Sequence, residues 1–490
     1  MMSLACILIM AVTFVAADPS CPLPLEPVPT TVDMQDTLKP IFDNSSLYFD
    51  QYLRLTNITA GVLGIANSGG LLFSHAYGLK NKLNPTSTPD LDTIFRIGSV
   101  TKVFASIAIY QLRDRGLIGS LDDPVQKYVP DFKPIDLYPG KRRGVTFRQM
   151  LSQMSGLPRE GCPLLNCNWT DAYMWDYIQK NVYLTFQPYQ EPSYSNLAFG
   201  ILGNVAAIVD GSPSFASYCQ KYIFDVLGMQ RSMFTAPPST ENNFAVGYYA
   251  DGTVAPLTDI GWEGPAGQMY STVNDLLLLL NDLMDPVQSK LFIFADTARQ
   301  LALPMFLNPS GSSAFGTPWE MQQVGSYLLD EKGGNIMGYS ACIVWIPRIR
   351  FAMAFLVSGQ ADEFAVSTGF ASAILPALTS YLQLHQAPYP LPTNALDYLG
   401  TYGGLLGVQI VNNSLGWIEN GRLSAVLMPF APDVFQIGVP GYGVPIPMDC
   451  LNLELQASIN AVVAFQRNSS GIVVSLTLPG NIPGQLFSKK

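Results

Sequence analysis

The stretch "FRIGSVTKVFASIAIYQLRDRG", residues 95–116, decides the fold: a turn of small residues leads into a pattern typical of an amphipathic helix. Gly116 marks the expected end of that helix. Ser99 and Lys102 stand at its front, and residues three apart on a helix share one face, so the Lys102 amine can reach the Ser99 hydroxyl. Two interpretations are open here, a solvated lysine near a helix start or a nucleophile beside its own base.

Histidine is nearly absent from the 490 residues, which contain only His75 and His385. His75 lies in a hairpin-like stretch and His385 borders a proline-rich segment, so both are expected to be structural. A histidine-ligated zinc site is therefore disfavoured, as is a Ser-His-Asp arrangement. If a serine is the nucleophile, another side chain must take its proton. The net charge of −10, without a basic stripe, argues against nucleic-acid binding.

The N-terminal segment predicts a secreted protein. Residues 1–17 are typical of a signal peptide, with an apolar run from Leu4 to Ala16 and the small residues Val15-Ala16-Ala17 before Asp18. The alternative, a membrane anchor, is disfavoured because the run is short and prolines follow it, so no stable membrane span is expected. Five Asn-x-Ser/Thr tripeptides are candidate glycosylation sites: Asn44, Asn57, Asn168, Asn412 and Asn468.

Cysteine usage fits an oxidising compartment. Six cysteines remain after removal of the signal peptide, and six cysteines allow many pairings. Cys162 and Cys167 are close enough in the chain to form a disulfide within one loop. Cys342 lies in an apolar run and is expected to be a free thiol in the core.

The pattern along the chain predicts a mixed α/β domain over residues 18–385, a proline-rich linker over 386–393 and a small β domain over 394–490. Within the large domain we expect a helix over 33–53, two strands that turn at 68–70, a helix capped by Ser271 or Thr272, two strands joined at 347–350, and a closing helix after 361. Hairpin signals at 420–421 and 470–471 mark the small domain.

Two further motifs each occur once in the chain. Tyr194-Ser195-Asn196 is the only Tyr-x-Asn and opens a helix-like run, while Lys332-Gly333-Gly334 is the only Lys-x-Gly and is expected at the start of a strand. The order of the three motifs carries more information than any one of them.

With these motifs in this order, the chain resembles the serine β-lactamase and penicillin-binding protein superfamily, in its class C β-lactamase, D-alanyl peptidase and esterase branch. Tyrosine rather than serine in the second motif indicates this branch. The stretches 150–158, 225–234 and 265–276 are similar to landmarks of the family. The resemblance covers about 40–385 and implies an antiparallel sheet flanked by helices, with a helical subdomain. Residues 398–404 resemble the opening of a lipocalin-like β domain.

The resemblance also implies roles at the site. Ser99 would be the acylated nucleophile, and Lys102 and Tyr194 would transfer its proton. Backbone N–H groups of Ser99 and Asn335 would form the oxyanion hole. The mechanism implied needs no metal and no cofactor. The expected substrate-binding residues are Asn196, Lys332, Gly334 and Asn335.

Three residues depart from the family pattern. Gly333 replaces a threonine or serine whose hydroxyl helps to hold a substrate carboxylate, and Ile336 and Met337 replace small residues beside the cleft. Losing one hydrogen bond to a charged group costs about 1.5–3 kcal/mol. We therefore expect small acyl esters or neutral amides to react faster than penicillins, and Gly333→Thr to narrow that difference.

The sequence predicts a secreted, metal-independent serine hydrolase that acts on a small-molecule or peptide ester or amide. Two alternatives stay open. One is acyl transfer to an alcohol or amine through the same acyl-enzyme. The other is a catalytically silent protein that binds a ligand or partner in the same pocket.

Overall fold

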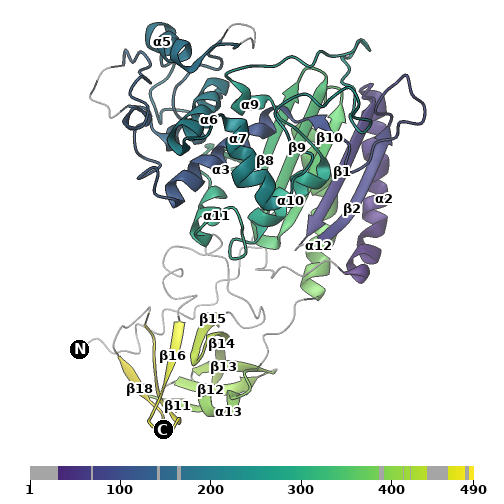
Figure 1. The fold of residues 1–490 in the computed structure, drawn as a ribbon. Coiled ribbons are helices and arrows are strands. Elements are labelled where there is room, and N and C mark those ends of the chain that lie inside the picture. The colour runs from purple at the N-terminus through teal and green to yellow at the C-terminus, as the bar shows by residue number, and fades with distance from the viewer. Residues whose placement is uncertain are drawn as a thin grey trace. The chain divides into compact units, whose positions relative to one another are not determined.

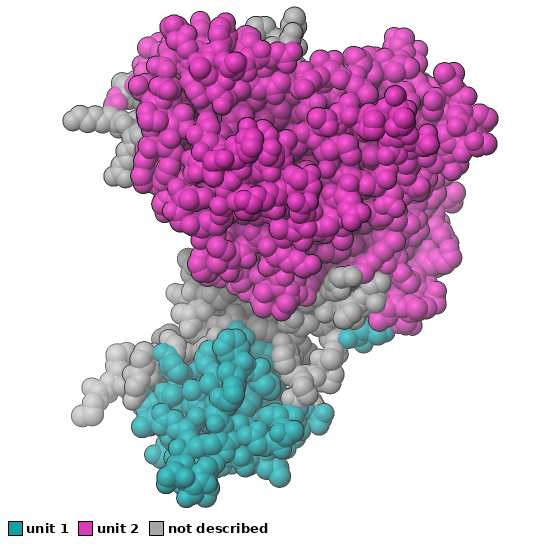
Figure 2. Space-filling view, viewed as in Figure 1, with its two compact units in different colours: residues 1–26, 379–490 teal, residues 27–378 magenta. Residues whose placement is uncertain are grey.

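The computed structural model describes residues 31–67, 70–138, 140, 144–162, 167–385, 391–404, 406–411, 413–419, 421–438, 462–479 and 485–490. The chain divides into a large compact unit, residues 27–378, and a smaller one that holds residues 379–490 (Figure 2). The boundary lies within helix α12 (Glu363–Leu384), ahead of the predicted linker. The predicted signal peptide and residues 386–390 of that linker lie outside the described residues.

The large unit is built on an eight-stranded antiparallel sheet with the strand order β2-β1-β10-β9-β8-β7-β6-β5. Strands β1, β9 and β10 are buried at every position, so both faces of the sheet must be covered. A separate ladder pairs β3 (Phe95–Arg96) with β4 (Tyr270–Ser271). The strands of the large sheet are β1 Ala60–Asn67, β2 Gly70–Gly78, β5 Phe306–Leu307, β6 Ser313–Phe315, β7 Glu320–Val324, β8 Tyr327–Ile336, β9 Tyr339–Ile346 and β10 Phe351–Ser358.

The predicted strands before and after the motifs are confirmed. β1 and β2 form the expected N-terminal hairpin, and β9 and β10 are joined by a 3₁₀ turn at Pro347–Ile349, followed by Arg350 with φ +48°. The expectation that Lys332 begins a strand is wrong. β8 begins at Tyr327 because its hairpin with β7 turns earlier, at Gly325 with φ +58°, so Lys332 lies within the strand.

Helices cover both faces of this sheet (Figure 1). On one face, the Phe49 ring of α2 (Val32–Leu55) lies 6.4 Å from the Phe355 ring on β10 and 5.6 Å from the Phe370 ring on α12. Glycines on β1 let the helices approach. A Cβ at Gly61 would meet Leu53 of α2 at 2.5 Å, and one at Gly64 would meet Val273 of α10 (Val273–Met284) at 2.6 Å. Since residues three apart on a strand face opposite ways, the two helices lie on opposite faces.

The remaining helices form the helical part of the large unit beside β8, with α3 and α6 at its centre (Figure 1). α3 is buried from Thr101 to Leu112, so it is a central helix rather than the amphipathic one that the sequence predicts. α10 starts after Thr272, which caps it as expected. The helices of this part are α3 Thr101–Asp114, α4 Phe147–Leu151, α5 Asp171–Asn181, α6 Asn196–Asp210, α7 Phe215–Cys219, α8 Asp225–Leu227, α9 Gly264–Gly267 and α11 Ala295–Leu301.

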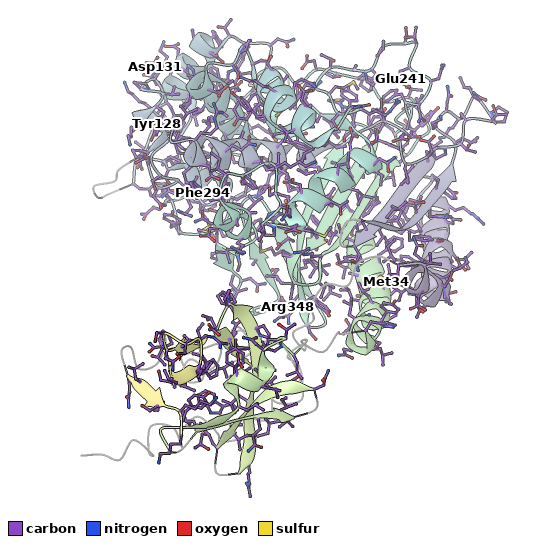
Figure 3. The ribbon with its side chains drawn as sticks, turned by 60° about the horizontal axis from the view of Figure 1, so that its bottom comes forward. Met34, Tyr128, Asp131, Glu241, Phe294 and Arg348 are labelled. Carbon is purple, nitrogen blue, oxygen red and sulfur yellow. A yellow bond between two sulfur atoms is a disulfide. The ribbon has the colours of Figure 1, made fainter. Side chains whose placement is uncertain are left out.

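The two long helices α2 and α12 turn apolar stripes toward the sheet. Met34, labelled in Figure 3, is buried on α2 and accepts a contact at 3.6 Å from Asn67 Nδ2 at the end of β1. α12 has the length and apolar composition of a membrane-crossing helix, as do the bent α6 and 215–227 segments taken together. In α12 the buried residues Val366, Phe370, Ile374 and Leu378 are four apart, which places them on one face of the helix.

The smaller unit is an antiparallel sheet of eight strands in sequential order, β11 to β18. Its first and last strands meet, because Gly403 N donates to Ser488 O at 2.9 Å and Lys490 N donates to Thr401 O at 2.8 Å. The sheet is thus nearly closed into a barrel around Tyr402, Trp417 and Phe465. Its elements are α13 Ala395–Tyr398, β11 Gly400–Tyr402, β12 Leu406–Val411, β13 Ser414–Glu419, β14 Arg422–Ala431, β15 Val434–Gly438, β16 Val462–Arg467, β17 Val473–Thr477 and β18 Leu486–Ser488.

Candidate active site

Ser99 lies in a 3₁₀ turn, Gly98–Val100, directly before α3. Gly98 has φ +49°, and a Cβ there would lie 3.1 Å from the Asn335 nitrogen on β8. The turn is fixed by Thr101, whose Oγ1 donates to Gly98 O at 2.6 Å and accepts from Met269 N at 3.2 Å. Ser99 itself is only half-buried. Its hydroxyl is therefore held in place and still reachable.

The Lys102 amine is enclosed by three oxygen atoms. Its Nζ lies 3.0 Å from Ser99 Oγ, 2.6 Å from Asn196 Oδ1 and 2.7 Å from Ala266 O. A neutral amine has two N–H donors and one lone pair. As an ammonium, Lys102 donates to all three oxygens; once neutral, it keeps its bonds to Asn196 Oδ1 and Ala266 O, and its lone pair can accept from the Ser99 hydroxyl. The lysine is fully buried, so a solvated surface role is wrong.

The second motif enters from the start of α6. Tyr194 Oη donates to Ser99 Oγ at 2.7 Å. Ser195 caps the helix by accepting from Ala198 N at 3.0 Å, and its own N–H donates to Gln153 Oε1 at 2.8 Å. These bonds fix the segment that carries the tyrosine. Asn196 donates through Nδ2 to Glu160 Oε1 at 2.8 Å, which turns its amide oxygen toward the lysine.

The environment favours loss of a proton from both neighbours of Ser99. Burial lowers the pKa of the Lys102 ammonium, and the charge of Lys332 lowers it further, against an opposing effect of Tyr194. Burial alone raises the pKa of the Tyr194 phenol, but the Lys102 and Lys332 charges outweigh it and hold that pKa below its ordinary value. Lys102 and Tyr194 form a coupled pair that can hold or release one proton beside the serine.

Lys332 lies on β8 with its Nζ 5.4 Å from the centre of the Tyr194 ring. It is buried and donates to Glu320 Oε2 on β7 at 2.8 Å and to Gly333 O at 2.8 Å. Burial lowers the pKa of Lys332, yet Glu320 and Tyr194 raise it enough to keep the amine a cation. Its positive charge near Tyr194 is therefore partly offset by the Glu320 carboxylate, a partner that the sequence analysis missed.

Gly334 is the point at which β8 and the Ser99 turn make their closest approach. A Cβ at this position would lie 2.2 Å from Ile97 O and 2.8 Å from the Ser99 nitrogen. Only a glycine permits this contact. The close approach brings the backbone of β8 at Gly334 and Asn335 next to the turn that carries Ser99.

A cleft of about 200 Å³ opens beside Ser99. Its walls are mostly backbone and apolar atoms, with a few polar side chains. A larger hollow of about 520 Å³ lies near Asp92 and Arg231 and is lined by none of the motif residues. The cleft is lined by Gly98, Ser99, Asn196, Ile260, Glu263, Ala266, Gly267, Asn335, Ile336, Met337 and Gln360. Ile336 and Met337 thus lie beside the nucleophile, as the sequence predicts.

The structure bears on the expectation that Gly333→Thr restores the missing hydroxyl, because the space beside Gly333 is occupied. A Cβ there would meet Glu363 Cγ at 2.7 Å, Glu363 Oε1 at 2.8 Å and Phe364 Cζ at 2.8 Å. Side chains of α12 fill the space that a threonine would need. Gly333→Thr would displace them and would not simply restore a hydroxyl.

The contributors that were not found from the sequence include Ala266 O, Glu160, Glu320 and Glu363. A backbone carbonyl carries no side-chain signal, although Ala266 lies in one of the landmark stretches. Glu320 could have been inferred, because a lysine in a buried strand needs an anionic partner. Glu160 and Glu363 depend on tertiary contacts.

The other predicted residues lie apart from these contacts. His75 Nε2 is 2.7 Å from Asp50 Oδ1, and His385 stacks on Tyr381 at a ring distance of 3.9 Å. Cys162 and Cys167 form a disulfide, and Cys342 is free and buried, both as expected.

Among the described residues, one group of potential metal ligands converges, Cys162 and Cys167 with Glu263. Its two sulfur atoms are joined to each other, so they cannot act as thiolates. The candidate glycosylation residues Asn44, Asn57, Asn168 and Asn468 are exposed, and Asn412 lies outside the described residues.

Comparison with known proteins identifies a family. The family model Beta-lactamase matches residues 48–374. A human beta-lactamase-like 1 protein is 31% identical over 387 residues, which cover 76% of each chain. The structure of an octameric penicillin-binding protein homologue from Pyrococcus abyssi has a TM-score of 0.61 at 19% identity and covers 92% of this chain and 100% of that one.

A class C beta lactamase from Rhodobacter sphaeroides has a TM-score of 0.57 at 20% identity and covers 68% of this chain and 99% of that one. These likenesses confirm the predicted fold, a helix-flanked antiparallel sheet with a helical subdomain, followed by a small, nearly closed β unit. The family match spans all three motifs; Lys102 and Tyr194 contact Ser99, and Lys332 lies beside the Tyr194 ring. The chain belongs to the beta-lactamase family of serine hydrolases.

Proposed function

We propose that this chain is a secreted serine hydrolase that takes an acyl group from an ester or amide onto the Ser99 hydroxyl. One observation carries the proposal: Ser99 Oγ lies 3.0 Å from Lys102 Nζ and 2.7 Å from Tyr194 Oη. Two proton-accepting groups at hydrogen-bond distance are what an otherwise weak hydroxyl nucleophile needs.

In the first step, the Lys102–Tyr194 pair takes the Ser99 proton as Oγ attacks the substrate carbonyl. The lysine lone pair or the tyrosinate oxygen can accept it, and Asn196 Oδ1 and Ala266 O keep the lysine in position. The new C–O bond converts the carbonyl oxygen into an anion. The backbone N–H groups of Ser99 and Asn335 would donate to that oxyanion, a contribution of about 3 kcal/mol for each donor by analogy with other hydrolases.

In the second step, the bond to the leaving group breaks and the same pair returns the proton to the departing alcohol or amine. The acyl group stays on Ser99 Oγ. A water molecule then attacks the ester carbonyl and gives a proton to the pair. The bond between the carbonyl carbon and Ser99 Oγ breaks, the pair returns the proton to Oγ, and the acid leaves. The described residues supply every proton transfer, so we expect activity to survive prolonged treatment with a chelator. Loss of activity that added zinc restores would contradict this mechanism.

Secretion is the second part of the proposal. It rests on the signal-like residues 1–17, and the Cys162–Cys167 disulfide and four exposed Asn-x-Ser/Thr sites are compatible with it. We expect the protein recovered from the medium of expressing eukaryotic cells to begin at Asp18. An intact N-terminus on a cell-retained protein would contradict it.

Pre-steady-state kinetics test the hydrolase itself. With an activated ester in excess, we expect a burst of leaving group close to one equivalent of enzyme, followed by slower turnover. Neither burst nor turnover over a broad ester and amide panel would favour a silent binding protein. A new ester formed when an alcohol is added would show that acyl transfer competes with hydrolysis.

A further inference from the structure

Glu363, the first residue of α12, occupies the place of the missing side chain in the third motif. Its Cγ and Oε1 lie 2.7 Å and 2.8 Å from the position of a Cβ on Gly333. The family resemblance assigns to that position a hydroxyl that helps to hold a substrate carboxylate. In this chain the same place is filled by a carboxyl group.

A hydrogen bond to the cleft wall fixes the Glu363 side chain. Its Oε2 accepts from Asn335 Nδ2 at 2.6 Å, and Asn335 Oδ1 in turn accepts from Ser340 Oγ. Asn335 lines the cleft beside Ser99, as does Gln360, which precedes α12. The carboxyl group therefore stands at the edge of β8, next to the path along which a bound substrate must lie.

The positive charge of Lys332 on β8 does not fully compensate the carboxyl group of Glu363. Lys332 is the lysine of β8, and its Nζ already pairs with Glu320 Oε2 at 2.8 Å. Lys332 thus acts on two carboxyl groups: it pairs with Glu320, and its charge lowers the pKa of Glu363 against the larger raising effect of burial. A substrate carboxylate placed along the strand would face Glu363 without the hydroxyl partner that could compensate the repulsion.

We propose that Glu363 determines charge specificity for the leaving-group side of the substrate. It disfavours esters and amides with a carboxylate beside β8 and favours neutral or cationic ones. The inference rests on the proposed acylation of Ser99 and goes beyond it by naming the residue and the substrate class.

Matched esters test this inference on the full-length protein. Phenylacetylglycyl esters of 3-hydroxybenzoate, 3-hydroxybenzamide and 3-hydroxybenzylamine share one shape and carry a negative, a neutral and a positive leaving group. Rates are divided by those of hydroxide-catalysed hydrolysis, to remove differences in intrinsic reactivity. The variant Glu363→Gln keeps the size and the acceptor for Asn335 but removes the charge.

The control variant is Asp362→Asn, which removes a negative charge one residue away and keeps an acceptor for Ala365 N. In Glu363→Gln we expect the anionic-to-neutral ratio of kcat/KM to rise roughly 10-fold and the cationic-to-neutral ratio to fall by a similar factor. In Asp362→Asn both ratios should change less than about 2-fold, because that group points to solvent at the helix start.

The outcomes separate the two proposals. Ratios in Glu363→Gln that stay within 2-fold of wild type, with all three esters still turned over, would overturn the role of Glu363 and leave the hydrolase intact. Equal changes in both variants would also overturn it, since they would show a long-range charge effect. Failure of every ester to acylate the wild type would overturn the proposed function and this inference with it.

Discussion

At the scale of single residues, the protonation state of the Lys102–Tyr194 pair controls whether Ser99 can react. Ser99 can lose its proton only while the Lys102–Tyr194 pair has a vacant position for it. The pKa values of both groups lie below their ordinary values of 10.5 and 10.0. Acylation should therefore increase with pH and level off below the range in which free lysine and tyrosine titrate.

Two substitutions on β7 and β8 should move this pH profile in opposite directions. Lys332→Met removes a cation that lowers the pKa of both Lys102 and Tyr194, so the rising limb should move to higher pH. Glu320→Gln removes a carboxylate that raises both pKa values, so the limb should move to lower pH. Each shift should be on the order of one pH unit. The profile of kcat/KM against pH measures it.

Glu331→Gln is the matched control, because Glu331 adjoins Lys332 on the strand and its carboxyl bonds to Ser367 on α12. In Glu331→Gln the rising limb of the profile of kcat/KM against pH should not move. If Lys332→Met and Glu320→Gln moved the limb in the same direction, the shared-proton account would be wrong.

At the scale of elements, function depends on how closely β8 approaches the turn that carries Ser99. Gly334→Ala would put a Cβ 2.2 Å from Ile97 O and push the strand away from the turn. We expect a loss of at least about 100-fold in kcat, since separation of the two backbone amides removes a donor of the oxyanion hole. The control is Gly369→Ala on α12, where the nearest atom would be 3.4 Å away. Wild-type rates in Gly334→Ala would contradict this arrangement.

The packing of β8 against α12 also gives the fold a pH dependence. Burial raises the pKa of Glu331 to about 7, from an ordinary value of 4.5. The folded protein then holds a proton that the unfolded chain loses, so the free energy of unfolding falls as pH rises from 4.5 to 7. The contribution of this one group is roughly 3 kcal/mol over that interval.

Glu331→Gln should flatten this decline, as measured by denaturant unfolding at several pH values. The control is Asp296→Asn, because the Asp296 side chain is 94% exposed and should leave the decline unchanged. A steeper decline in Glu331→Gln than in wild type would show that the carboxyl is ionised in the folded state.

At the scale of the whole molecule, the side chains around Ser99 all come from the large unit. The residues that contact Ser99 or hold its neighbours in place include Gln153 in the helical part and Glu363 at the start of α12. The smaller unit has a core of its own around Tyr402 and Phe465. We expect a chain that ends at residue 385 to keep its rate of acylation within about 3-fold. A loss of acylation in a truncated protein that still unfolds cooperatively would contradict this.

The sequence predicted the features that depend on residues close together in the chain, and it missed those that depend on contacts between distant residues. Ser99 with Lys102, and Tyr194 with Asn196, are local motifs at helix starts, where spacing alone places the side chains. The hairpins β1–β2 and β9–β10 were equally local. Lys332 was misplaced within its strand because the turn at Gly325 gives a weak signal. Glu320 and Glu363 could not be assigned, since strand register and the docking of α12 bring them to the site.

The most direct test of the central claim is the intact mass of the protein after reaction with a fluorophosphonate, followed by peptide mapping. We expect one adduct, located on Ser99, and none in Ser99→Ala. Ser106→Ala, which changes a serine on α3 seven residues after Ser99, should label as the wild type does. An adduct of unchanged stoichiometry in Ser99→Ala, or one mapped to another residue in the wild type, would contradict the account.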